Sequence, residues 1–201
     1  MAKKKKLKAP KGAKRAGPIE RTDAALGAAA ARYRKTPVVR ALHAIGQVAD
    51  QPPLIIGSVA TIAAGAVLRR PRLLRAGTRM LASELVATAA KGLVKHHVAR
   101  TRPGTMLRDG RYALQKDKDG DKDRGPWNSF PSGHTAGAVA VGRALVREYP
   151  AAAPLVAGGV ALIALIQPFT GAHFPSDVAA GGAVGLVSEA AVEGIAQAAG
   201  A

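Results

Sequence analysis

The chain has 201 residues, which is enough for one domain but short for two. It contains no cysteine, so disulfides and thiolate metal sites are excluded, and cysteine usage says nothing about the redox compartment. The formal charge of +17 is unevenly spread: residues 1–40 carry thirteen Lys or Arg against two acidic residues, so +11 of the charge lies there.

Residues 1–35 are predicted to form a basic, disordered tail. The lysine run that begins at Lys3 is followed by mixed polar sequence rather than by an apolar segment, so it is not a secretory signal peptide. Runs of like charge usually stay solvated. We expect the tail to contact anionic lipid on the inner membrane face. Nucleic-acid binding is the alternative, but no aromatic side chains interleave with the lysines for base stacking.

The remaining residues, 36–201, are predicted to form an all-α domain. Helices are expected at 36–48, 53–68, 73–98, 132–147, 151–167 and 176–198, with a charged loop at 104–129. A bilayer crossing needs about 20 mainly apolar residues, and several of these segments are shorter. A soluble helical bundle is the alternative, but residues 151–166 are apolar on all sides, which favours a membrane protein. Gly181 and Gly185 have the four-residue spacing that suits close helix packing in lipid.

The short basic joints between these segments predict the orientation. If residues 36–48 cross the membrane, the tail, the arginines at 69–75 and those at 143–147 all lie on one side, which the positive-inside rule makes cytoplasmic. The expected protein then crosses the plasma membrane six times. Its tail is cytoplasmic, and the ends of the third, fourth and sixth helices form an active site that faces outward. Whether 36–48 crosses is the open point, because without it the tail changes sides relative to the other segments.

Polar clusters stand at these three helix ends. Lys95 and Arg102 supply positive charge and hydrogen-bond donors for a phosphate. Ser132 and Gly133 begin a helix, where exposed backbone N–H groups and the helix dipole form an anion site.

Two histidines belong to the same clusters. His134 and His173 can exchange protons near neutral pH. Asp177 follows His173 by four residues, about one helical turn, so its carboxylate could hold one imidazole nitrogen and leave the other free to attack. Taken singly, such patterns are often only caps or local hydrogen bonds, but their combination on one face is far more specific.

The combination resembles the type 2 phosphatidic acid phosphatase family, relatives of bacterial nonspecific acid phosphatases and vanadium haloperoxidases. The family pattern is Lys-x6-Arg-Pro, then Pro-Ser-Gly-His, then Ser-Arg-x5-His-x3-Asp. The resemblance covers roughly residues 84–190. The matching positions are Lys95, Arg102 and Pro103 in the first element, 131–134 in the second, and His173 and Asp177 in the third.

The resemblance implies hydrolysis of a lipid phosphate or pyrophosphate through a phosphohistidine intermediate, with no metal and no cofactor. His173 would attack phosphorus, Asp177 would orient it, and His134 would protonate the leaving oxygen. The groups implied to bind the phosphoryl oxygens are Lys95, Arg102, Ser132 and the Gly133 amide. Phosphatidic acid, phosphatidylglycerol phosphate, polyprenyl pyrophosphate and polyprenyl-phosphosugar phosphate all remain open as substrates.

One position departs from the family pattern, because Ile166-Gln167 stands where Ser-Arg is usual. Gln167 can donate hydrogen bonds to a phosphate but brings no charge. A slower enzyme, a substrate whose other phosphate is bound elsewhere, and compensation by Arg100 are the open explanations. A degenerate, noncatalytic member of the family is the alternative.

Two further features carry weaker predictions. The acidic loop 117–123 resembles a calcium loop, but Asn128 stands where EF-hand spacing requires Glu, so we expect a solvated loop. Glu84, Lys91 and Lys95 share one helix face, either to support Lys95 or as a structural ion pair. The sequence gives no prediction of oligomeric state.

Overall fold

The computed structural model describes residues 17–116 and 125–200. Its helices are α1 (Pro18–Ala31), α2 (Pro37–Gly46), α3 (Gln51–Val67), α4 (Pro71–His97), α5 (Pro103–Asp109), α6 (Gly133–Glu148), α7 (Ala153–Thr170) and α8 (Pro175–Ala198). Strands β1 (Val98–Arg100) and β2 (Leu114–Lys116) pair antiparallel, with Val98 opposite Lys116. Single 3-10 turns occur at Gln47–Ala49, Gly125–Trp127 and Pro150–Ala152. The predicted all-α class is confirmed, and the acidic loop at 117–123 lies outside the described residues.

Proline marks where many of these helices begin. It occupies the first turn of α1, α2, α4, α5 and α8. Proline is well suited to this position because its fixed φ is already helical and the N–H that it lacks would have no partner in the helix. At the other end of α7, Gly171 adopts a left-handed conformation with φ of 78° and stops the helix. The helix therefore ends just before the segment that carries His173.

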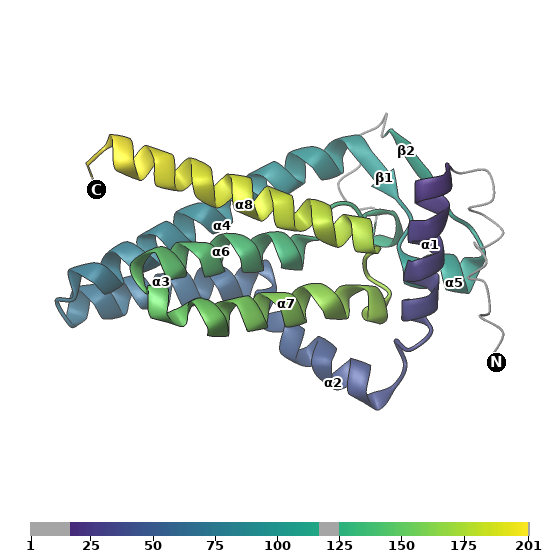
Figure 1. The fold of residues 1–201 in the computed structure, drawn as a ribbon, viewed down its shortest axis with the longest axis horizontal. Helices are drawn as coiled ribbons and strands as arrows, with labels where there is room; N and C mark the ends of the chain where they lie inside the picture. Colours follow the sequence, from purple (N-terminus) through teal and green to yellow (C-terminus); the bar gives the residue numbers. More distant parts are fainter. Residues whose placement is uncertain (1–16, 117–124, 201) are drawn as a thin grey trace.

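The five long helices α3, α4, α6, α7 and α8 run along one another to form the bundle (Figure 1). Helix α4 packs against α3, α6 and α8, and α6 also packs against α7. Gly181 and Gly185 let α8 approach α6 closely, because a Cβ on either would collide with the carbonyl oxygen of Ser132 or Ala136. This close approach sets the start of α8 directly against the start of α6, which are two of the predicted site segments.

Two helical segments, Pro150–Thr170 and Pro175–Ala198, are long and apolar enough to cross a membrane, and Gln51–Val67 is apolar but shorter. Only 11% and 22% of the most apolar stretches of the two longer segments are buried inside the protein. Large apolar side chains are exposed along them, among them Leu155 and Ile195. Apolar surface of this kind is stable in lipid rather than in water, which fits a membrane protein.

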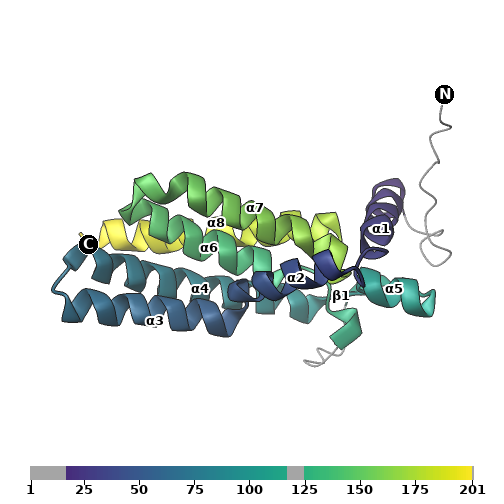
Figure 2. The same ribbon diagram turned by 90° about the horizontal axis from the view of Figure 1, so that it is seen from below.

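Helix α1 corrects the predicted tail. The tail was expected to be disordered through residue 35, but residues 18–31 form a helix that packs beside α5 at one end of the bundle (Figures 1 and 2). Its buried alanines, Ala24 and Ala28, pack against Met106 and Phe174. Residues 1–16 lie outside the described part of the chain.

Helix α2 bears on whether residues 36–48 cross the membrane, the point that the sequence left open. It has 10 residues and is therefore about 15 Å long, half of what a bilayer core of about 30 Å requires. Because α2 is too short to cross, α1 stays at the same end of the bundle as His173 and contacts the start of α8. The predicted arrangement, in which the tail and the site lie on opposite sides of the membrane, is thus not supported for residues 18–31.

Candidate active site

His173 lies in the short segment between α7 and α8, with 3% of its surface exposed. Its Nδ1 atom is 2.6 Å from the backbone carbonyl oxygen of Ser129. A carbonyl oxygen can only accept a hydrogen bond, so Nδ1 must carry the proton and donate it. The lone pair of the neutral ring is then on Nε2, which is the arrangement a nucleophilic histidine needs.

The surroundings of His173 also favour its neutral form. Burial lowers the pKa of His173 well below its usual value, and the positive charges of Arg102 and Lys95 lower it further. A pKa below the usual range means that the imidazole stays neutral at neutral pH and when the medium becomes mildly acidic. His173 therefore offers a nucleophilic nitrogen beside two cations that are suited to binding phosphate.

Asp177 does not hold His173, contrary to the sequence-based expectation. Its Oδ2 atom is 3.9 Å from His173 Nδ1, too far for a hydrogen bond. The i, i+4 argument fails because α8 begins at Pro175, so His173 precedes the helix and is not one helical turn from Asp177. Asp177 instead accepts hydrogen bonds from the Ser129 hydroxyl and from the Phe174 backbone N–H, the latter at 2.7 Å. It thus fixes Ser129, whose carbonyl in turn fixes His173.

Arg100 does not replace the missing family arginine, because its donors are already engaged. It donates to Asp177 at 2.5 Å, to Asp23 at 2.6 Å and to the Ser176 hydroxyl at 2.7 Å, and it lies 3.3 Å from the Tyr112 hydroxyl. Burial acts to lower the pKa of Arg100, but the carboxylates and the phenol outweigh it, and the net pKa is raised. Arg100 is a permanent cation that neutralises two buried aspartates behind the site.

Arg102 and Lys95, the two cations expected to bind phosphate, lie within electrostatic range of each other and of His173. Arg102 caps α5, and its Nε atom is buried without a hydrogen-bond partner in the described part of the chain. Burial lowers the pKa of Arg102, but arginine titrates so high that the group remains charged at neutral pH. Lys95, near the end of α4, lies within electrostatic range of Arg102 and Asp177. A buried cationic donor without a partner destabilises the folded protein unless an anion binds to it.

Ser132 and Gly133 begin α6 as predicted. The Ser132 hydroxyl accepts a hydrogen bond from the Thr135 N–H at 3.4 Å, and the Ser132 N–H donates to the Asp177 carbonyl oxygen at 2.9 Å. The second bond ties the start of α6 to the first turn of α8. The Ser132 hydroxyl is also 3.0 Å from the Thr135 hydroxyl, so the backbone N-terminus of α6 is the part of this segment that can receive an anion.

His134 has an acidic neighbour that sequence analysis did not identify. Its Nε2 atom is 2.9 Å from Oδ1 of Asp50, the residue that precedes α3. The Asp50 carboxylate favours the protonated imidazole, which is the form that can donate a proton, but burial favours the neutral form more strongly and the net pKa of His134 is lowered. Asp50 was missed because it stands 84 positions from His134 in the sequence and belongs to no recognisable motif.

Gln167 stands where the family pattern has an arginine, and Lys91 is a cation close to the same site. Gln167 is buried, its Nε2 atom donates to the Ile163 carbonyl at 3.2 Å, and its Oε1 atom has no partner in the described residues. Lys91, one turn before Lys95, extends toward the start of α6. Its Nζ atom is 3.6 Å from the position that a Cβ on Gly133 would occupy. Lys91 is therefore a third cation at the predicted phosphate site. The sequence analysis had considered its helix face only as a support for Lys95.

Two further residues that hold the site together come from α1 and from the segment before α6. Asp23 accepts hydrogen bonds from the Ser176 N–H at 3.0 Å and from Arg100, which joins α1 to the start of α8. Ser129 supplies both the carbonyl that holds His173 and the hydroxyl that binds Asp177. A sequence signal for α1 was present in Pro18 followed by Glu20 and an alanine run. No comparable signal marks Ser129, because it acts mainly through its backbone.

Comparison with known proteins adds to this geometry. Residues 76–199 match the PAP2 superfamily, which is more than half of the chain. A solved structure with a similar fold is the crystal structure of the first transmembrane PAP2 type phosphatidylglycerolphosphate phosphatase from Bacillus subtilis. It has 19% sequence identity and a TM-score of 0.59, and the match covers 89% of this chain and 86% of that chain. No curated protein matches the sequence.

Proposed function

The chain belongs to the PAP2 superfamily, as its motifs predicted, and from this premise we propose that it hydrolyses a lipid phosphate through a phosphohistidine on His173. Family membership supports phosphatase activity, and the exposed apolar helices fit an enzyme whose substrate lies in the membrane. The observation that carries the proposal is the hydrogen bond from His173 Nδ1 to the Ser129 carbonyl. It leaves Nε2 unprotonated beside Arg102 and Lys95.

The proposed reaction has two steps. The lone pair on His173 Nε2 attacks phosphorus, the bond from phosphorus to the lipid oxygen breaks, and protonated His134 gives its proton to that oxygen. Neutral His134 then takes a proton from water, whose oxygen attacks the phosphohistidine. This releases inorganic phosphate and restores both histidines. The scheme needs no metal ion for either transfer.

Charge stabilisation in this scheme comes from groups that lie near His173. Negative charge grows on the phosphoryl oxygens in each transition state, and fixed cations stabilise it without reorganisation. We assign this role to Arg102 and Lys95, with Ser132 and the Gly133 amide as neutral donors. Lys91 supplies the charge that Gln167 lacks. Asp177 is a positioning residue, because it acts on His173 through Ser129.

A noncatalytic member of the family is the second candidate, and Gln167 is the observation that favours it. Purified protein in neutral detergent micelles should separate the two, by release of inorganic phosphate from a panel of lipid monophosphates and pyrophosphates in the presence of a chelator. An active enzyme releases phosphate from at least one of them. Absence of release from the whole panel would establish the noncatalytic alternative.

His173→Ala should abolish this turnover, because no other group replaces the attacking nitrogen. It should also remove the acid-labile phosphoenzyme that a rapid quench traps from the unmodified protein. His96→Ala is the matched control, since His96 is exposed at the end of α4 and should leave both signals unchanged. Retention of full activity by a folded His173→Ala protein would exclude the mechanism.

A further inference from the structure

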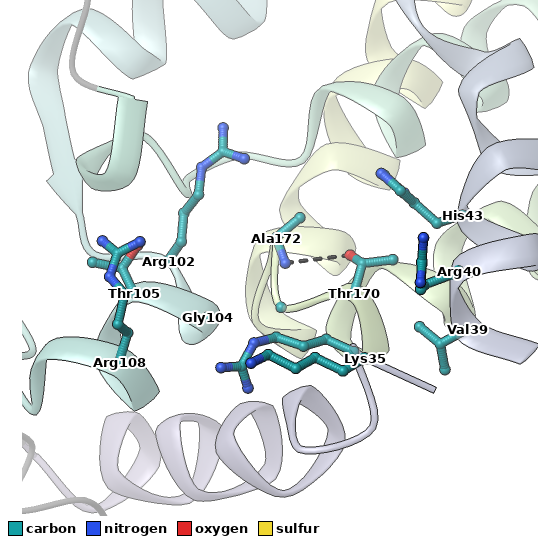
Figure 3. A pocket seen from close by; sticks show the side chains of 12 residues that line it. Lys35, Val39, Arg40, His43, Arg102, Gly104, Thr105, Arg108, Thr170 and Ala172 are labelled. Carbon is teal, nitrogen blue, oxygen red and sulfur yellow. Dashed lines mark hydrogen bonds between the residues drawn. The ribbon is translucent and has the colours of Figure 1, made fainter. Parts of the chain in front are cut away.

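A cavity of about 560 Å³ lies beside the proposed active site, between α2 and α5 (Figure 3). Its walls come from the turn after α1, from α2, from α5 and from the end of α7. The basic or imidazole side chains that line it are Arg34, Lys35, Arg40, His43, Arg102 and Arg108. No acidic residue lines it among the described residues. The cavity is therefore strongly positive.

Most of these charges have no anionic partner within the described part of the chain. Arg108 pairs with its neighbour Asp109 at 2.7 Å, and Arg34 donates to the Ala31 carbonyl at 3.0 Å. Lys35 and Arg40 are exposed and form no salt bridge with any described residue. Several like charges around one cavity repel one another, so an anion between them is stabilising.

The cavity adjoins the proposed phosphatase site and shares Arg102 with it. Ala172 lines the cavity as well and immediately precedes His173. The wall is held in place by a 2.8 Å hydrogen bond from the Gly104 N–H to the Gly171 carbonyl oxygen, which joins α5 to the segment that carries His173. A substrate bound at His173 can thus extend directly into the cavity.

Helix α2 places this cavity at the level of lipid head groups. Val38 and Ile45 are exposed on α2, at 68% and 56%, whereas Arg40 and His43 of the same short helix face the cavity (Figure 3). Amphipathic helices with apolar residues on one side and basic residues on the other lie in the membrane interface. The cavity volume is within the range of small-ligand sites and exceeds what one phosphate group needs.

We propose that this cavity is a second anion subsite, outside the phosphatase motifs, which binds a second phosphate in the head group of the lipid substrate. The inference rests on the proposed function and adds the substrate class to it. The substrate is a lipid whose head group carries two phosphates, the terminal one cleaved at His173 and the inner one held by Lys35 and Arg40.

The test compares Lys35→Gln/Arg40→Gln with the unmodified protein on two lipids in neutral detergent micelles. Phosphatidic acid has one phosphate, whereas phosphatidylglycerol phosphate has an inner phosphodiester and a terminal monoester. We expect KM for the second lipid to rise about tenfold or more, since two charge-assisted contacts are lost. KM for phosphatidic acid should not change. Arg32→Gln is the matched control, because Arg32 is exposed two residues before Arg34 and does not line the cavity.

Other outcomes would overturn the proposal. An equal rise in KM for both lipids would mean that the cations attract membrane lipid in general, and no change for either would mean that the cavity does not bind substrate. If the protein releases no phosphate at all, the proposed function fails, but the subsite is still tested by binding. Flotation with phosphatidylcholine vesicles that contain one or the other lipid should then show preferential binding to the two-phosphate lipid. The double variant should lose that preference, and failure to see it would refute the subsite.

Discussion

Arginine side chains have different partners at the two ends of the helical bundle. At the end away from His173, Glu148 contacts Arg75 and Arg79, and Glu189 accepts hydrogen bonds from two further arginines, Arg143 and Arg147, at 2.8 Å each. At the site end, Arg100 is paired in this way with Asp23 and Asp177, and Arg108 pairs only with its neighbour Asp109 among the described residues. The cations Lys91, Lys95 and Arg102 form no salt bridge there with a described residue. Paired cations join helices, whereas cations that lack a partner indicate where a ligand supplies the negative charge.

This comparison predicts opposite effects for arginine substitutions at the two ends. Arg102→Gln should lower kcat/KM about 100- to 1,000-fold, the usual cost of removing a donor that stabilises developing negative charge. It should leave the thermal unfolding temperature unchanged or slightly higher, because a buried cation without a partner is removed. Arg143→Gln at the other end should lower the unfolding temperature and leave kcat/KM unchanged. Phosphate release and thermal unfolding in detergent measure both. Equal loss of activity in the two variants would contradict the distinction between the ends.

A smaller effect on activity is expected from substitution of Lys91, a cation near the start of α6 that does not belong to the family motif. Lys91→Gln should lower kcat/KM about tenfold, the equivalent of one charge-assisted hydrogen bond. If position 167 also reaches the phosphate, Gln167→Arg should restore much of that loss in the same chain. The four proteins of this double-mutant cycle should be assayed on the same lipid. Independent, additive effects of the two substitutions would show that Lys91 and Gln167 do not serve the same group.

The smallest effect on activity is expected from substitution of the carboxylates that pair with arginines at the end away from His173. Glu189→Gln should lower the free energy of unfolding by about 1–3 kcal/mol, because two ionic hydrogen bonds become neutral while the arginines can still reach solvent. For a chain of this length each kcal/mol corresponds to about 2–4 °C in the unfolding temperature. Glu193→Gln is the control, since Glu193 contacts Arg79 and is more exposed than Glu189, so its loss should be smaller. A fall in kcat/KM for Glu189→Gln would show that the far end also influences the site.

Much of the fold was predictable because local signals marked the helix ends. Prolines at the first turns and apolar runs of helical length place the expected segments within a few residues of α2–α4 and α6–α8. Helix α1 was not found, because the lysine run before it led residues 1–35 to be assigned as a whole to one basic tail, although α1 itself contains one basic residue, Arg21. The buried positions of α1 contact residues far along the chain, with Ala24 and Ala28 against Phe174 and Asp23 against Ser176. At Gly27 a Cβ would collide with the ring of Phe174.

The site was predictable where chemistry is carried by side chains in motifs, and not where it is carried by the backbone or by distant residues. Lys95, Arg102 and His134 lie within electrostatic range of His173, and Ser132 is hydrogen-bonded to Asp177 near it. The partner of His173 was assigned wrongly. A spacing of four residues brings two side chains together only within one helix, and α8 begins at Pro175, after His173. The actual partner is a carbonyl oxygen of Ser129, and no side-chain pattern reveals a carbonyl.

The contact between α1 and the start of α8 also sets the order in which the molecule can be completed during synthesis. Asp23 leaves the ribosome early, but Arg100 follows 77 residues later and Ser176 follows 153 residues later. Until α8 has been made, Asp23 has only part of its final set of partners, and neither His173 nor Asp177 has been added. The earliest helix therefore lacks its final partners while almost the whole chain is produced. Catalytic geometry is consequently among the last properties that the nascent protein acquires.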